Sequence, residues 1–115
     1  HSTSRRQRQM CIRDRYTAGG LTVDFDKRLV RVEGKDIHLT QIEYKIVEFL
    51  ARHPGRVMTY DAIMIHVWGP YLTDDNKILR VNMANIRRKL EKNPAEPQYI
   101  QTEMGIGYRI AEEDS

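Results

Sequence analysis

Apolar residues recur with a helical period between residues 74 and 92. The positions of this stripe are Leu79, Met83, Ile86 and Leu90. Steps of four, three and four residues place them on one side of a helix with 3.6 residues per turn. The pattern therefore predicts a helix from Asp74 to Lys92, which ends before Asn93-Pro94 because a residue preceding proline avoids the α conformation.

Two shorter helices are predicted before this one. Thr40 and Glu43 have the spacing of a capping box and introduce an apolar stripe, which indicates a helix ending at about Arg52. Thr59 can cap a second helix that ends at Gly69-Pro70.

The segments around the helices alternate or carry turn residues, as strands and hairpins do. Apolar residues alternate with polar ones over residues 21–25, and residues 29–32 and 36–39 follow after turn-forming residues, which predicts a small antiparallel sheet. Order is expected to begin near Gly20.

Two further strands, at residues 99–103 and 108–110, flank Met104-Gly105-Ile106-Gly107, whose glycines are expected to supply the positive φ of a tight hairpin. Because side chains alternate across a strand, Arg109 is expected to point away from the face of Tyr108 and Ile110.

This order of elements predicts an α+β fold, a winged helix-turn-helix with an N-terminal antiparallel sheet, a three-helix core and a C-terminal β-hairpin wing. The domain is assigned to residues 20–111, after a disordered arm at residues 1–19 and before an acidic tail at residues 112–115. Residues 10–15 resemble a translated sequencing adaptor, which leaves the native origin of residues 1–15 open. At 115 residues the chain is long enough for one core only.

The distribution of charge along the chain is more informative than the net charge. The net charge is +3, but residues 1–15 carry +4, so the remainder of the chain sums to −1. Between Lys77 and Arg109 there are seven Lys or Arg and three Glu, a local +4. The single cysteine permits no internal disulfide, and neither a secretory signal nor a membrane-spanning run is visible, so a bacterial cytoplasmic protein is the simplest fit.

The predicted helix at residues 74–92 has a second face that is basic and partly apolar. Its members are Lys77, Val81, Ala84, Asn85 and Arg88, with Arg80 and Arg87 on one flank. A helix in a DNA major groove needs such a surface, whereas the plain alternative is a solvated basic face.

The chain also resembles the output domain of OmpR/PhoB-type response regulators, and within them KdpE-type regulators of potassium-transport genes. The residues that carry the resemblance are Leu39-Thr40-Gln41-Ile42-Glu43-Tyr44, Val67-Trp68-Gly69, Ile86-Arg87-Arg88-Lys89-Leu90 and Thr102-Glu103-Met104-Gly105-Ile106-Gly107-Tyr108-Arg109. The resemblance implies a four-stranded N-terminal sheet and binding to direct-repeat DNA as a head-to-tail homodimer. It also implies a sensor kinase acting through a receiver domain that this sequence does not contain.

Candidate roles follow for individual residues. Lys77, Arg80 and Arg87 are expected to contact phosphates, which give affinity without specificity.

Arg88 is the first candidate for a guanine contact, with a phosphate contact as its alternative, while Asn85 suits adenine and Val81 a thymine methyl. Further backbone candidates are Thr59 and Tyr60, at a helix N-terminus, and Thr102.

The resemblance adds two more assignments. Arg109 resembles the family's wing arginine and is expected in an A/T-rich minor groove, with an ion pair to Glu103 as the alternative. Residues Pro70, Tyr71, Leu72, Thr73 and Asp74 match the family's loop that touches RNA polymerase, or form a plain connector.

Two other function classes compete with DNA binding. A winged helix used for protein interaction would bury Val81 and Ala84 against a partner. An enzyme is the poorest reading, since no nucleophile with a base and no paired acids in a plausible pocket are present. His38, His53 and His66 lack metal-ligand spacing, so neither a metal nor a cofactor is expected.

Overall fold

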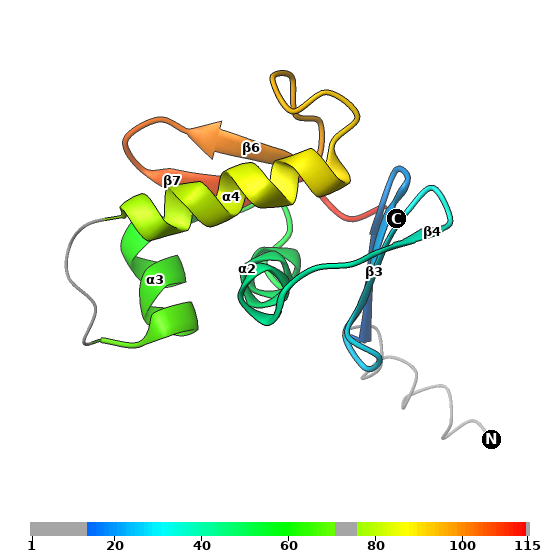
Figure 1. Cartoon of the computed structure of the whole chain (residues 1–115), viewed down its shortest axis with the longest axis horizontal. Coiled ribbons are helices and arrows are strands. Elements are labelled where there is room, and N and C mark those ends of the chain that lie inside the picture. Colours follow the sequence, from blue (N-terminus) through cyan, green and yellow to red (C-terminus); the bar gives the residue numbers. More distant parts are fainter. Residues whose placement is uncertain (1–13, 71–75, 115) are drawn as a thin grey trace.

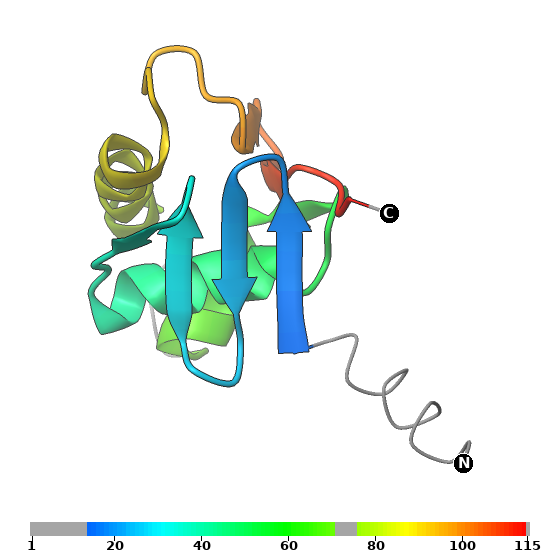
Figure 2. The same cartoon turned by 90° about the vertical axis from the view of Figure 1, so that its right-hand side faces the viewer.

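The computed structural model describes residues 14–70 and 76–114. Its elements form an N-terminal sheet, a three-helix layer and a C-terminal sheet (Figures 1 and 2). The predicted winged-helix architecture is confirmed. No helix within these residues is long and apolar enough to cross a lipid bilayer.

The N-terminal sheet is a four-stranded antiparallel meander. Its strands are β1 (Arg15–Ala18), β2 (Leu21–Asp24), β3 (Leu29–Val32) and β4 (Lys35–Ile37), in that order across the sheet. Figure 2 shows this sheet face-on with the helices behind it.

The first strand, β1, corrects the predicted start of the domain. Order was expected from Gly20, but Tyr16 and Ala18 are buried and pair with Val23 and Leu21. The strand is only four residues long and directly follows an arginine-rich segment, so its alternation is too short to stand out. The rest of the predicted arm, residues 1–13, lies outside the part that the structure describes.

The helices are α2 (Gln41–Ala51), α3 (Tyr60–Trp68) and α4 (Lys77–Leu90). The capping box at Thr40 and Glu43 is confirmed, and Thr59 caps α3 by accepting from the Ala62 N–H. The end of α4 was predicted too late, because Glu91 already has an extended backbone and the helix stops at Leu90. The predicted start at Asp74 was too early, because α4 begins at Lys77 and Asn76 is its N-cap; Asp74 itself lies outside the described residues.

The C-terminal sheet has three strands where the sequence predicted two. Strands β6 (Ile100–Glu103) and β7 (Gly107–Ile110) form the predicted hairpin, and β5 (Val57–Thr59) pairs with the other side of β7. Strand β5 was missed because it has three residues and directly precedes α3. We call this three-stranded sheet the wing.

The core lies where the helix layer meets both sheets. It is built from the inward faces of β1 to β3, of all three helices and of β6 and β7. Two cations also join the N-terminal sheet to α2, with Arg52 over the Phe25 ring at 4.2 Å and Arg28 over the Tyr44 ring at 4.7 Å. Helix α4 rests on this body beside β6 and β7 (Figure 1).

Candidate nucleic-acid interface

Helix α4 has the two faces that the sequence predicts. Leu79, Met83, Ile86 and Leu90 are buried, with at most 2% of each exposed. On the opposite side Val81 is 55% exposed, and Lys77, Arg80, Ala84 and Arg88 are also exposed.

Asn85 and Arg88, the two polar base-reading candidates, are in contact. The Arg88 guanidinium donates through Nη2 to Asn85 Oδ1. The bond uses one acceptor site of the amide and leaves the Asn85 NH₂ group and the other guanidinium donors for an external partner. The two side chains therefore form one preassembled polar unit on the outer face of α4.

Arg87 lies on the flank of α4 and points to the wing. Its Nη2 donates to Ile100 O at 3.0 Å and to Thr102 Oγ1 at 2.7 Å, and its guanidinium carbon lies 5.5 Å from the centre of the Tyr108 ring. The sequence predicted a phosphate contact and gave no sign of these contacts, since they join residues 13 and 15 positions apart.

Arg109 points to the face of the wing opposite Tyr108 and Ile110, as alternation predicts. Tyr108 and Ile110 are buried, whereas the Arg109 side chain is 42% exposed and forms an ion pair with Glu103 at 3.2 Å. The ion pair with Glu103, which is the alternative predicted for Arg109, is thus present in the free protein. The residues at the tip of the wing are instead Met104 and Ile106, which are 86% and 53% exposed.

The two glycines of the hairpin have different tasks. Gly105 has φ +76°, as expected for the turn, but Gly107 is not among the residues with positive φ, so that half of the expectation is wrong. A Cβ on Gly107 would lie 1.8 Å from Met58 O. Gly107 is required because β5 and β7 approach each other too closely for a side chain.

The N-terminus of α3 is occupied from within the fold. The Tyr60 N–H donates to Ile106 O at 3.1 Å, and the Ala62 N–H donates to Thr59 Oγ1 at 3.0 Å. A phosphate site made of these amides is therefore not available, and capping accounts for Thr59. Thr59 ends strand β5 of the wing, and the Tyr60 ring meets Tyr108 of β7 edge-on at 5.5 Å.

Tyr108 contributes a neutral phenol to the space between α4 and the wing. Burial and the neighbouring Tyr60 raise the pKa of Tyr108 and outweigh Arg87 and Arg80, which lower it. The phenol therefore stays a neutral hydrogen-bond donor, on the ring that the Arg87 guanidinium approaches. Sequence reasoning placed Tyr108 only by its strand face and missed this position.

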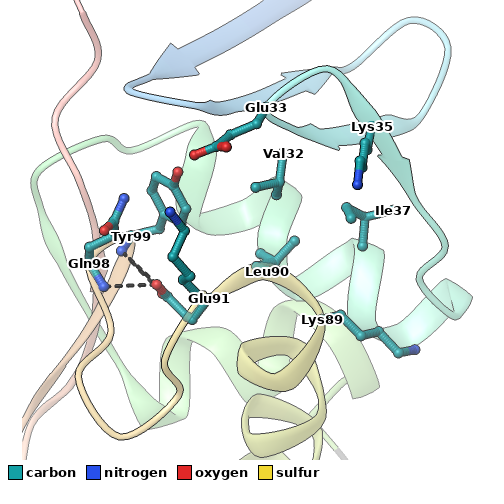
Figure 3. A pocket seen from close by; sticks show the side chains of 10 residues that line it. Val32, Glu33, Lys35, Ile37, Lys89, Leu90, Glu91, Gln98 and Tyr99 are labelled. Atoms are coloured by element: carbon teal, nitrogen blue, oxygen red, sulfur yellow. Dashed lines mark hydrogen bonds between the residues drawn. The ribbon is translucent and has the colours of Figure 1, made fainter.

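A pocket of about 290 Å³ lies on another side, between β3, β4 and the end of α4 (Figure 3). Glu91 reaches across it and accepts from the backbone N–H groups of Gln98, Tyr99 and Ile100 at 2.8 to 3.2 Å. The carboxylate therefore holds the start of β6 to the end of α4. The pocket has no catalytic pair, and no metal-ligand cluster occurs in residues 14–70 and 76–114.

Comparison with known proteins decides the family. Residues 34–110 match the family described as "Transcriptional regulatory protein, C terminal". The chain belongs to this family.

The relatives of this transcriptional regulatory domain include the KDP operon transcriptional regulatory protein KdpE of Escherichia coli. That protein is 38% identical over 90 residues, which are 78% of this chain and 40% of KdpE. The chain thus spans less than half of the relative's length.

Solved structures agree in fold. The response regulator DrrB of Thermotoga maritima, an OmpR/PhoB homologue, superposes with a TM-score of 0.78 at 31% identity, covering 85% of this chain and 44% of DrrB. The RstA DNA-binding domain of Klebsiella pneumoniae, solved in complex with the RstA box, gives a TM-score of 0.77 at 29% identity, covering 84% of this chain and 96% of that domain. The resemblance to OmpR/PhoB-type winged-helix DNA-binding domains is confirmed.

In this transcriptional regulatory domain, the predicted polymerase-contact loop is only partly visible. Pro70 is exposed just after α3, while Tyr71, Leu72, Thr73 and Asp74 lie outside the described residues. Two exposed apolar residues, Ile65 on α3 and Ile78 on α4, belong to the helices that this loop connects.

Proposed function

We propose that this domain binds promoter DNA sequence-specifically as the output domain of a two-component response regulator. In this proposal α4 enters the major groove and the wing approaches the neighbouring minor groove. The observation that carries it is the outer face of α4, where exposed cations surround Val81 and the Asn85–Arg88 pair. The RstA domain, which has the same fold, was solved in complex with the RstA box, which supports this assignment.

The residues divide into two groups by their chemistry. Lys77, Arg80 and Thr102 suit phosphate contacts, and the side chains of Thr59 and Tyr60 are further candidates. Val81, Asn85 and Arg88 suit base edges, with Arg88 to guanine and Asn85 to adenine.

The whole regulator is expected to carry a receiver domain controlled by a sensor kinase, in the bacterial cytoplasm. The proposal includes head-to-tail homodimers on direct-repeat sites and an RNA polymerase contact through residues 70–74.

Selection of bound duplexes from random DNA by the 115-residue chain tests the function. We expect enrichment of one motif, repeated in direct orientation, and a log K against log salt slope of about −0.9 for each phosphate contact. Enrichment of no motif would contradict the proposal.

A protein-interaction module is the second candidate, because Val81 on α4 and both Met104 and Ile106 at the wing tip expose apolar side chains. It predicts weak DNA association with little salt dependence. The same salt titration therefore separates the two functions.

A further inference from the structure

Arg87 connects the proposed recognition helix to the edge strand of the wing. Strand β6 is an edge of the β5-β7-β6 sheet, so a row of its backbone groups faces away from β7. Arg87 donates to Ile100 O at 3.0 Å, and Glu91 accepts from Ile100 N–H at 3.0 Å. Both polar groups of the Ile100 backbone are thus held by side chains from the C-terminal end of α4.

The same guanidinium also reaches Thr102, two residues nearer to the wing tip. Arg87 Nη2 lies 2.7 Å from Thr102 Oγ1, and Arg87 has no carbonyl or hydroxyl to accept the threonine proton. Thr102 must therefore be the acceptor in this bond. Its own O–H proton is left to donate to another group, in a direction away from the guanidinium.

Arg87 itself is packed against the wing. Its Nη2 makes both hydrogen bonds described above, its Nε is buried, and the guanidinium carbon lies 5.5 Å from the Tyr108 ring centre. By contrast, Arg80 on the same helix is exposed. A guanidinium that is anchored on the wing in this way is suited to orient the Thr102 side chain. It is less suited to move with a phosphate of bound DNA.

We propose that Arg87 is a positioning residue for DNA binding: it fixes the wing against α4 and presents the Thr102 hydroxyl as a donor to a phosphate oxygen. This inference rests on the proposed DNA-binding function. It assigns the phosphate contact to Thr102, and Arg87 acts mainly through that contact.

A double-mutant cycle on a duplex recovered by the selection above tests this assignment. We expect Thr102→Val and Arg87→Met each to weaken binding about tenfold, as loss of one charge-assisted hydrogen bond does. The double variant should bind within about twofold of Arg87→Met, because the two changes remove the same contact. Thr102→Ser, which keeps the hydroxyl, should bind like the unmodified chain.

The matched control is Arg80→Met, which removes an exposed cation from the same helix. Its effect should multiply with that of Thr102→Val and should lower the salt slope by about one phosphate contact. Arg87→Lys keeps the charge, so under our assignment it weakens binding while the salt slope stays unchanged. It also replaces Arg87→Met in the cycle if the methionine variant does not fold.

Two outcomes separate the claims. If losses from Arg87→Met and Thr102→Val multiply to about a hundredfold, Arg87 contacts the phosphate directly and the positioning role is wrong. If the unmodified chain shows no salt-dependent binding to any duplex, the proposed function itself fails.

Discussion

Asn85 and Arg88 share a hydrogen bond, so their contributions to site recognition are expected to be coupled. Alanine at either position should relax the preference at its base pair by about 1 to 3 kcal/mol. Arg88→Ala also frees Asn85 Oδ1, and Asn85→Ala leaves the guanidinium without its internal acceptor, so the double variant should lose less than the sum of the two. Binding to a panel of single-base variants of the selected site measures both effects.

Lys27 provides the control for this pair, because it is an exposed cation in the turn between β2 and β3 and does not belong to α4 or the wing. Lys27→Ala should change affinity little and leave the base preference intact. Strict additivity of Asn85→Ala and Arg88→Ala would mean that their contact is lost before DNA binds.

The ion pair with Glu103 is expected to restrain Arg109 in the free protein. If Arg109 acts in the minor groove, Glu103→Gln should release it and tighten binding about threefold at A/T-flanked sites, more than at G/C-flanked ones, because a narrow A/T groove attracts arginine. Arg109→Ala should weaken binding with the same dependence on flanking sequence. Equal effects at both kinds of site would assign Arg109 to the hairpin pair alone.

Among the elements, the wing depends on one glycine for packing and on another for its turn. Gly107→Ala should destabilise the domain by about 3 kcal/mol or more, because the new Cβ would have to displace the backbone of β5 at Met58. Gly105→Ala keeps an open position with φ +76° and should cost only about 1 to 2 kcal/mol. Urea unfolding of the two variants measures the difference, and equal losses would contradict the close approach of β5 and β7.

Helices α2 and α4 are joined by an ion pair that should make stability depend on pH. Lys89 Nζ lies 2.6 Å from Glu43 Oε1, and Glu43 is 3% exposed. Burial alone would raise the pKa of Glu43, but hydrogen bonds from Lys89 and Thr40 outweigh it and lower the pKa below its ordinary value. The unfolded chain therefore binds this proton more readily, and the stabilisation is present at neutral pH and is lost as pH falls below about 4.

Glu43→Gln should accordingly destabilise the domain at pH 7, by about 1 to 3 kcal/mol since Lys89 remains partly in water. The difference from the unmodified chain should shrink as the pH approaches 3. Urea unfolding at a series of pH values measures it, with Glu48→Gln, from the more exposed pair with Arg52, as the control. A difference that is constant between pH 7 and pH 3 would exclude the ion pair as its cause.

The elements that sequence predicted well are those with local signals. Each such signal lies within a few residues of the helix start, helix end or helix face that it determines. Examples are the Thr40 capping box, the end of α3 at Gly69 and the apolar stripe of α4. Strand β1 was missed because its alternation covers only four residues beside an arginine-rich segment. Strand β5 was missed because it has three residues and its partner, β7, lies far along the chain.

The same distinction holds for the candidate site. The outer face of α4 could be read from helical periodicity, which fixes the direction of Val81, Asn85 and Arg88. The contact of Arg87 with Thr102 could not, because the distance between α4 and β6 is set by tertiary packing and by Glu91. The sequence thus identified which side chains share a helix face. It did not identify which of them already form hydrogen bonds within the protein.

At the scale of the molecule, the chain after the wing ties the two sheets together. The Ala111 N–H donates to Tyr99 O, and the Asp114 N–H donates to Thr17 O of β1. The Asp114 carboxylate accepts from the Gly19 N–H at 3.1 Å. Residues 111–114 therefore run from the end of β7 to β1, where Figure 2 shows the C-terminus. The predicted acidic tail has a structural role in this path.

Tyr16 is the buried part of this connection between the two sheets. Its hydroxyl donates to Ala111 O at 2.5 Å, while its ring is 1% exposed in the core. Burial and the nearby Glu113 and Asp114 raise the pKa of Tyr16 above its ordinary value, so the phenol remains a neutral donor. Tyr16→Phe should keep the packing, leave the Ala111 carbonyl without this donor and cost about 1 to 3 kcal/mol.

The fold supplies a matched control in Tyr44, whose buried hydroxyl has no hydrogen-bond partner in the part of the chain that the structure describes. Tyr44→Phe removes the same atom and should be neutral or slightly stabilising, since no bond is lost. Because the Tyr16 bond joins β1 to the end of β7, Tyr16→Phe should also speed amide exchange at Thr17, Ala111 and Asp114 more than in α3. Equal unfolding free energies for the two phenylalanine variants would show that the Tyr16 hydrogen bond does not help to hold the sheets together.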